Sequence, residues 1–315
     1  MPFIRADVQP ILALLAAQPG PKLNEGTPEE GRAGMLAMVQ MMERPRAALA
    51  EVRDLAIPAP DGHPIPLRLY RASLDTAPAP VLTYFHGGGW VIGDIASHDS
   101  LCAEISATLG MTVVSVDYRL APEHRFPKAV DDCVAAARWV AASPADIGHP
   151  VTGIVPAGDS AGGNLAAVIS QELVGEIRIL AQWLIYPGVD MTAAGGSMEE
   201  FAEGYLLTKA LMDWFMAHYL EGSDPKHLRA SPLFAESLAG QPPALVFTCG
   251  LDPLRDQGRA YAAKLVLHGV RTIYRDAPGQ IHGSATLRAA IPSAHADLLA
   301  NLRDLKLLID EAAAA

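Results

Sequence analysis

The sequence predicts an α/β fold in which a mostly parallel central sheet carries helices on both faces and a small helical cap. From about residue 81 onward, short and nearly continuous apolar runs alternate with segments of helical spacing, which is typical of parallel strands covered on both sides. The chain has 315 residues, about the length of one large domain. Half of these residues are hydrophobic and 19% are charged, so a sizeable core is available.

The expected core strands and helices follow one another in chain order. Residues 52–57 and 65–70 flank the turn signal Asp61-Gly62, which predicts a β-hairpin. Apolar runs predict further strands at residues 81–85, 112–116, 151–155, 179–185, 244–248 and 272–274. Helical spacing predicts helices from about residue 97, over 129–142, 165–174 and 256–268, and from about residue 293.

Two segments depart from this alternation and are expected to form the cap. Apolar residues at helical spacing predict a helix over residues 4–15, the residues at 19–21 (Pro, Gly, Pro) break it, and a Met-rich stretch at 35–42 predicts a second helix. A later interruption contains a loop and a helix at 209–220. The expected organisation is N-terminal cap helices in residues 1–48, core in 49–188, a cap insertion in 189–228 and the rest of the core in 229–315.

Charge and composition argue against several classes of partner. A formal net charge of −11 and a pI near 5.3 do not suit a surface that follows nucleic-acid phosphates. No run approaches the roughly 18 apolar residues of a membrane span. Cys102, Cys133 and Cys249 are widely spaced, so we expect buried thiols rather than disulfides or metal ligands. Residues 11–17 could pass for a signal-peptide core, but their helical spacing favours an amphipathic helix, and a cytoplasmic location is expected.

The strongest candidate for a nucleophile is Ser160. It stands in Gly158-Asp159-Ser160-Ala161-Gly162, which matches the G-x-S-x-G pattern, a weak signal when it occurs alone. Here the pattern follows a predicted strand and precedes a predicted helix, the setting in which a tight turn presents a serine hydroxyl above a sheet. The simpler alternative is an ordinary turn whose serine caps the following helix.

Three consecutive glycines provide candidate donors for an oxyanion. The segment His86-Gly87-Gly88-Gly89-Trp90 follows a predicted strand directly, and glycine N–H groups can approach a developing negative charge without side-chain interference. We expect Gly88 and Gly89 to donate, Gly87 to bend the loop, and Ala161, the residue after the nucleophile, to supply a third N–H. A phosphate-binding loop is the alternative, but no G-x-x-x-x-G-K-[ST] pattern accompanies these glycines.

Four motifs in one order and register resemble the hormone-sensitive-lipase family of α/β-hydrolases, chiefly its bacterial esterases. They are the HGGGW loop at 86–90, the YRLAPE segment at 118–123, the GDSAGG elbow at 158–163 and the DPLRD segment at 252–256. The similarity runs from about residue 50 to 310. The resemblance implies an α/β-hydrolase fold and a serine carboxylesterase that has a helical cap, prefers short to medium acyl chains and needs no cofactor or metal. Dimers are common in that family, so it also allows for a homodimer.

In this fold the catalytic residues follow the chain order serine, acid, histidine. Asp252 comes just after a predicted strand and is preferred as the acid over Asp256, which falls one turn into the next helix, where it suits the helix dipole. The first Asp of the DPLRD segment is also the acid that the resemblance implies. Of the ten histidines, His282 and His295 follow the last predicted strand. His282 lies in a segment, residues 277–283, that we expect to be a loop suited to a base, whereas His295 falls within the terminal helix.

Substrate-binding residues are expected around the glycine loop and in the cap insertion. Ser284 follows the His-Gly pair, where the family usually has a bulky apolar residue, so the shape of the adjacent pocket is in question. The methionines at 35–42 could line an acyl channel, although their helical spacing favours packing within the cap. Structural roles are expected for His86, Glu123 and Asp190. The expected pocket walls are Trp90, Leu206, Leu207, Trp214 and Phe215.

Three other functions fit the same motifs. An amidase or an arylacetamide-deacetylase-like hydrolase would use the same three catalytic residues. A non-catalytic receptor would resemble the gibberellin receptors, which have lost the catalytic histidine, whereas Ser160, Asp252 and His282 are all present here. A true lipase ranks below an esterase, because neither cap segment shows an exposed aromatic run suited to an oil interface.

Overall fold

The central sheet is mostly parallel, as predicted. The computed structural model describes residues 2–17 and 22–314. Within these residues, eight strands form one sheet in the order β1-β2-β4-β3-β5-β6-β7-β8. β1 pairs with β2 and β2 pairs with β4 in antiparallel fashion, whereas all later neighbours pair in parallel. The α/β prediction is therefore confirmed.

The predicted hairpin corresponds to β1 and β2, and the helix predicted in the cap insertion has the observed bounds of α7. The strands are β1 (Glu51–Pro58), β2 (Pro64–Arg71), β3 (Ala79–Phe85), β4 (Thr112–Val116), β5 (Val151–Asp159), β6 (Gln182–Ile185), β7 (Ala244–Leu251) and β8 (Thr272–Ile281). The helices are α1 (Gln9–Ala17), α2 (Pro28–Met42), α3 (Asp99–Leu109), α4 (Lys128–Ala141), α5 (Ala161–Leu173), α6 (Ser197–Glu200), α7 (Lys209–Leu220), α8 (Arg255–Leu267) and α9 (Pro292–Ala314). Short 3-10 helices are η1 (Leu23–Glu25), η2 (Ala145–Ile147), η3 (Pro232–Phe234) and η4 (Ser284–Thr286).

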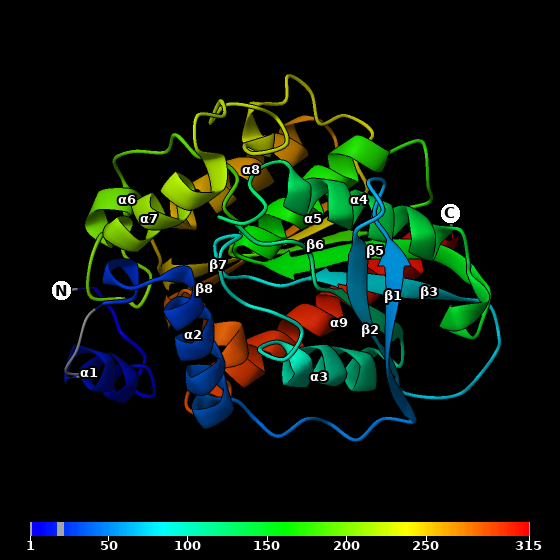
Figure 1. Cartoon of the computed structure of the whole chain (residues 1–315), viewed down its shortest axis with the longest axis horizontal. Helices are drawn as coiled ribbons and strands as arrows, with labels where there is room; N and C mark the ends of the chain where they lie inside the picture. Colours follow the sequence, from blue (N-terminus) through cyan, green and yellow to red (C-terminus); the bar gives the residue numbers. More distant parts are fainter. Residues whose placement is uncertain (1, 18–21, 315) are drawn as a thin grey trace.

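Helices cover both faces of the sheet (Figure 1). α4, α5 and α8 lie on one face, where their apolar side chains join those of the sheet in the larger core. α3 and α9 lie on the opposite face and form a second core. Because successive side chains of a strand point to opposite faces, Ile154 and Val155 of β5 fall in different cores. A strand buried on both faces needs apolar residues at every position, which explains the continuous apolar runs in the sequence.

Local sequence signals set the starts of α2 and α7. Thr27 Oγ1 accepts a hydrogen bond from the backbone N–H of Glu30, and the Glu30 carboxylate accepts one from Thr27 N–H, so a capping box begins α2. Thr208 Oγ1 likewise accepts from the N–H of Leu211 at the start of α7. These caps satisfy N–H groups that a helix start leaves without intrahelical partners.

Helices α2 and α7 lie beside the loop that follows β3, at the carboxyl ends of the parallel strands. Arg32 on α2 donates to the backbone oxygen of Val91 at 2.9 Å. The ring of Phe215 on α7 lies so close to Gly89 that a Cβ on this glycine would stand 2.2 Å from a ring carbon. The short helix η1 also contacts α7. That these segments act as a separate cap domain stays a prediction.

The last strand is longer than the sequence predicts. β8 continues to Ile281, because its pairing with β7 resumes after an irregularity and ends at the pair Leu251 and Ile281. The segment before His282, expected to be a loop, is therefore strand. Pro278 is tolerated there because β8 is at the edge of the sheet, where one side of the strand needs no ladder partner.

Other strand ends also differ from the prediction. β3 begins at Ala79, two residues before residue 81, and β7 continues three residues beyond residue 248 to Leu251. β5 extends four residues beyond residue 155 and ends at Asp159, next to Ser160. β6 begins at Gln182 rather than at residue 179, because Ile179 forms only an isolated bridge with Ile154. The helix break expected at residues 19–21 lies outside the described residues.

Candidate active site

Ser160 makes the tight turn between β5 and α5. β5 ends at Asp159 and α5 begins at Ala161, and Ser160 between them has φ 56° and ψ −116°. A positive φ at a non-glycine residue is strained, and such strain is typical of a serine held out above a sheet. The turn can close only because residue 162 is glycine: a Cβ there would stand 1.9 Å from the backbone oxygen of Phe85.

Asp252 and His282 reach Ser160 because they follow neighbouring strands. Asp252 comes directly after β7 and His282 directly after β8, and these two strands pair in parallel. His282 Nε2 lies 2.8 Å from Ser160 Oγ, and His282 Nδ1 lies 2.8 Å from Asp252 Oδ2. An ionised carboxylate can only accept, so Nδ1 carries the proton and the Nε2 lone pair faces the serine hydroxyl. The structure thus brings together the three residues that the sequence suggests as nucleophile, acid and base.

The two competing residues have other surroundings. Asp256 accepts a hydrogen bond from the N–H of Ser197 at 2.9 Å and forms an ion pair with Arg255 at 2.8 Å. The hydrogen bond from Arg255 holds the pKa of Asp256 below its ordinary value. His295 lies within α9, where burial lowers its pKa. It is Asp252, and not Asp256, that contacts His282.

The glycine loop leaves the three predicted donors free. Gly88 and Gly89 have φ values of 119° and 59°, a region that favours glycine. Among the described residues, no protein acceptor takes a hydrogen bond from the N–H groups of Gly88, Gly89 or Ala161. The N–H of Gly87 is engaged, since it donates to Asp159 Oδ1 at 2.9 Å. Gly87 therefore shapes the loop, while the other three N–H groups are available to a bound oxygen atom.

Asp159, which sequence reasoning does not single out, joins the serine turn to the glycine loop. Its Oδ1 accepts from Gly87 N–H and from the Tyr84 hydroxyl, at 2.9 Å each, and lies 3.1 Å from His98 Nε2. Burial alone would raise the pKa of this carboxyl, but the charge and hydrogen bonds of His98 and Tyr84 hold it below its ordinary value. The carboxylate stays ionised and anchors the loop. A charged residue inside an otherwise small and apolar turn is the signal that could have found it.

His86 and the segment after β4 support the glycine loop. The His86 ring stacks on Tyr118 with centroids 4.2 Å apart, and the Tyr118 hydroxyl donates to the backbone oxygen of His86 at 2.6 Å. Burial lowers the pKa of His86 to about 4, so its ring is neutral near pH 7. Glu123 pairs with Arg32 of α2 at 2.7 Å, and this hydrogen bond lowers the pKa of Glu123 to about 2. Both side chains thus have structural partners.

A cavity of about 100 Å³ opens beside Ser160. The glycine loop, α7 and the segment after β6 supply its walls, and three of the expected pocket residues, Trp90, Leu207 and Phe215, line it. The methionines of α2 do not line it. The cavity is also lined by residues that sequence reasoning missed. Nothing in the sequence fixes the course of the segment at 189–216, which supplies Asp190, Met191, Met198, Lys209, Met212, Asp213 and Met216, and the start of α8 adds Leu254 and Gln257.

Two expected pocket residues, Leu206 and Trp214, do not line this cavity. Leu206 lies instead near Gly283, where a Cβ on the glycine would stand 3.4 Å from the leucine side chain. Trp214 packs against His218 of its own helix, with ring centroids 4.5 Å apart. Consecutive residues of a helix point about 100° apart, so Phe215 faces the glycine loop and Trp214 cannot.

Three further features of the described part of the chain are the state of its cysteines, the grouping of its metal-binding side chains and the length and apolar character of its helices. Cys102, Cys133 and Cys249 are buried free thiols. Within residues 2–17 and 22–314, no three His, Cys, Asp or Glu side chains gather in a way that could hold a metal ion. The helices described there include none with the length and apolar character needed to span a bilayer.

The chain is similar to known proteins both in sequence and in structure. A family model described as alpha/beta hydrolase fold matches residues 82–286. The chain is 43% identical over 265 residues to the carboxylic ester hydrolase LipN of Mycobacterium tuberculosis, covering 81% of this chain and 70% of LipN. It is 35% identical over 254 residues to ethyl acetate hydrolase of Pseudomonas putida, covering 79% of this chain and 80% of that protein. Ester-hydrolase EH1AB1 from the metagenome of Lake Arreo, solved with a bipyridine phosphonate derivative, superposes with a TM-score of 0.91 at 37% identity, covering 97% of this chain and 99% of that one.

Proposed function

Because the chain belongs to the hormone-sensitive-lipase-like esterases of the α/β-hydrolase family, we propose that it hydrolyses short- to medium-chain acyl esters through an acyl-enzyme intermediate on Ser160. The enzyme is a carboxylic ester hydrolase, the activity that its relatives' names state. The observation that carries the assignment of residues is the hydrogen-bonded line from Ser160 through His282 to Asp252.

Proton transfer by His282 drives both halves of the reaction. Nε2 accepts the hydroxyl proton as Ser160 Oγ attacks the ester carbonyl carbon, and Asp252 stabilises the imidazolium that forms. His282 then gives this proton to the leaving alkoxide, so the alcohol departs and the acyl group stays on Ser160. Water attacks the acyl-enzyme by the same steps and releases the acid. A protonated His282 cannot accept the serine proton, so activity falls in acid.

The negative charge that develops on the carbonyl oxygen has donors close to the nucleophile. The N–H groups of Gly88, Gly89 and Ala161 are free of protein acceptors in the described residues, and Gly89 and Ala161 line the same cavity as Ser160. Fixed donors of this kind stabilise the tetrahedral intermediate without reorganising during the reaction. Loss of one such donor typically lowers the rate by about 10²–10³-fold.

The cavity beside Ser160 is suited to the acyl part of the ester. The leaving oxygen must take its proton from His282, so the alcohol part lies on the His282 side. His282 is absent from the residues that line the cavity, which leaves the cavity for the acyl chain. Its walls are largely apolar and its volume is only about 100 Å³. Both properties support short to medium acyl chains.

A series of p-nitrophenyl esters from acetate to palmitate tests this proposal. We expect kcat/KM to be highest between acetate and octanoate and to fall steeply for longer chains. A matched p-nitroanilide should be a much poorer substrate. A maximum at palmitate, or equal rates on ester and anilide, would contradict the proposed substrate class.

A further inference from the structure

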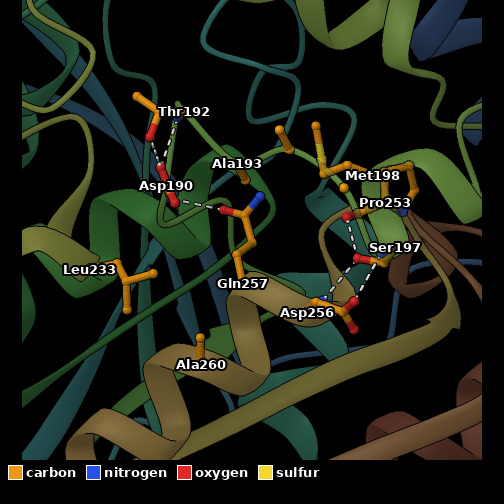
Figure 2. A pocket seen from close by; sticks show the side chains of 12 residues that line it. Asp190, Thr192, Ala193, Ser197, Met198, Leu233, Pro253, Asp256, Gln257 and Ala260 are labelled. Carbon is orange, nitrogen blue, oxygen red and sulfur yellow. Dashed lines mark hydrogen bonds between the residues drawn. The ribbon is translucent and has the colours of Figure 1, made fainter.

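A second, larger cavity lies next to the cavity beside Ser160. It has a volume of about 440 Å³ and lies between the segment after β6 and the start of α8 (Figure 2). The two cavities share four lining residues, Asp190, Ala193, Met198 and Gln257. An acyl chain that is too long for the small cavity therefore contacts these shared residues first.

Gln257 is a hydrogen-bond donor in the shared wall whose orientation is fixed. Its Oε1 accepts hydrogen bonds from the backbone N–H of Val189 at 2.6 Å and of Asp190 at 2.8 Å. Because two donors hold the oxygen, the amide cannot flip, and Nε2 must point the other way. Figure 2 shows this nitrogen on the side of Ala193, away from Asp190.

The Nε2 group of Gln257 is a donor that lines both cavities and has no acceptor among the described residues. Gln257 as a residue is only 7% exposed, and no described residue accepts a hydrogen bond from its side-chain nitrogen. A donor that is accessible from a cavity can hydrogen-bond to water or to a ligand group that replaces the water. A donor that lines both cavities is placed to meet an oxygen atom carried by the acyl chain.

We infer that the enzyme selects esters whose acyl chain carries a neutral oxygen acceptor, such as an ether or hydroxyl oxygen, and that Gln257 Nε2 donates to it. This inference rests on the proposed function, because it needs Ser160 as nucleophile and the small cavity as acyl site. A carboxylate is a poorer fit. Asp190 lines both cavities and forms no ion pair with any described residue, so its charge opposes an anion, whereas Lys209 of the small cavity is already paired with Asp213 at 2.6 Å.

Matched esters of equal chain length measure this selectivity directly. p-Nitrophenyl hexanoate is compared with 3-ethoxypropanoate and 4-methoxybutanoate, in which one methylene of the chain is replaced by oxygen. Each kcat/KM is divided by the rate of hydroxide hydrolysis, which removes the intrinsic effect of the oxygen. We expect the unaltered enzyme to prefer at least one ether ester over hexanoate by about fivefold, the ratio that one neutral hydrogen bond provides.

The variant Gln257→Glu tests whether this residue is the donor. A carboxylate keeps an oxygen for the N–H groups of Val189 and Asp190 but replaces the donor with an acceptor, so the ether-to-hexanoate ratio should fall by about fivefold or more. Gln9→Glu, at an exposed position of α1, adds the same charge elsewhere and should leave the ratio unchanged.

The outcomes separate this inference from the proposed function. An enzyme that hydrolyses acetate and hexanoate esters but shows no ether preference, or a ratio that Gln257→Glu leaves unchanged, overturns the inference alone. An enzyme that hydrolyses none of these esters overturns the proposed function. If Gln257→Glu does not fold, the comparison on the unaltered enzyme still decides, since the absence of any ether preference there overturns the inference.

Discussion

Each of the two carboxylate oxygens of Asp252 accepts one hydrogen bond. Oδ2 contacts His282 Nδ1 at 2.8 Å, and Oδ1 accepts from the N–H of Leu254 at 2.8 Å. The carboxylate is fully buried, so it cannot turn toward solvent. This arrangement fixes both the position of the imidazole and the nitrogen that carries its proton.

The variants Asp252→Asn and Asp256→Asn should therefore differ strongly in kcat. An amide at 252 can donate to Nδ1 and favours the wrong tautomer, so we expect kcat to fall by about 10⁴-fold. At 256 the side chain is 43% exposed and contacts Ser197 and Arg255, so we expect a change of no more than a few-fold. Steady-state kinetics with p-nitrophenyl acetate measure both values. Equal losses in the two variants would contradict the assignment of the acid.

Asp117 is a carboxyl whose burial opposes folding at neutral pH. It follows β4, and burial, together with the nearby charge of Asp94, raises its pKa to about 6. Arg68 and the N–H of Ile95 act in the opposite direction. Since the folded-state pKa lies above the ordinary value, the folded state binds more protons between about pH 4 and 6. Stability is thus lost as the pH rises through this window and is not regained above it.

The variant Asp117→Asn should stabilise the fold at pH 8 and have little effect at pH 4. The side chain is 35% exposed, so solvent screening limits the expected gain to about 1 kcal/mol in the free energy of unfolding. Urea unfolding at the two pH values measures this difference. A gain of the same size at pH 4 and pH 8 would show that the effect does not arise from the charge.

At the scale of single residues, motifs with fixed chemistry could be predicted and pocket directions could not. Ser160, Asp252 and His282 were placed by the turn pattern and the chain order, and the structure brings them into contact. For Leu206 and Trp214 the sequence indicates only the residue type and the approximate position. Their directions depend on how α7 is rotated against the glycine loop, which is a property of tertiary packing.

At the scale of elements, hydrophobic periodicity predicts the type of an element, helix or strand, more reliably than it predicts the residue at which the element ends. α7 and β4 have the predicted bounds because Thr208 caps the helix and the strand is a compact apolar run. β8 exceeds its prediction by seven residues, because pairing with β7 continues through a segment with turn-type residues, Pro278 and Gly279. Tertiary pairing overrode local propensity there.

In the proposed binding mode, Phe215 of helix α7 limits the depth of the cavity beside Ser160. Its ring is 7% exposed and rests on Gly89, next to two of the predicted oxyanion donors. An aromatic ring in this position limits how far an acyl chain can extend past Ser160. The length preference of the enzyme is therefore expected to depend on this side chain.

The variant Phe215→Ala should shift the preference toward longer acyl chains. Removing the ring enlarges the cavity, so the ratio of kcat/KM for decanoate to kcat/KM for acetate should rise about tenfold. This is the size of effect expected when one or two additional methylene groups of the substrate fit into an apolar pocket. Trp214→Ala is a matched control on the same helix, since this ring does not line the cavity. An equal shift in both variants would mean that α7 acts through its stability and not through Phe215.

At the scale of the whole molecule, a buried ion pair ties the N-terminal helices to the C-terminal part of the core. Arg288 is fully buried, and its Nη2 lies 2.9 Å from Glu43 Oε1 at the end of α2 and 3.0 Å from Ser100 Oγ on α3. The backbone N–H groups of Ala289 and Ala290 also donate to Met42 O. Three segments far apart in the sequence thus meet at one guanidinium group.

The variant Glu43→Gln should destabilise the fold by about 3 kcal/mol, because it leaves the buried charge of Arg288 with only the more distant carboxylate of Glu104, at 3.9 Å. Glu29→Gln removes the same charge from an exposed position of α2 and should cost no more than about 1 kcal/mol. Chemical denaturation gives both values. Equal effects in the two variants would show that the pair does not tie α2 to the core.

The most direct test of the whole account is covalent labelling with an organophosphonate, followed by mass spectrometry of the digested protein. The account predicts one phosphonyl group per chain, attached to Ser160, with esterase activity lost in proportion to labelling, and neither label nor activity in Ser160→Ala. Attachment to another residue, or full activity in the labelled enzyme or in Ser160→Ala, would contradict it.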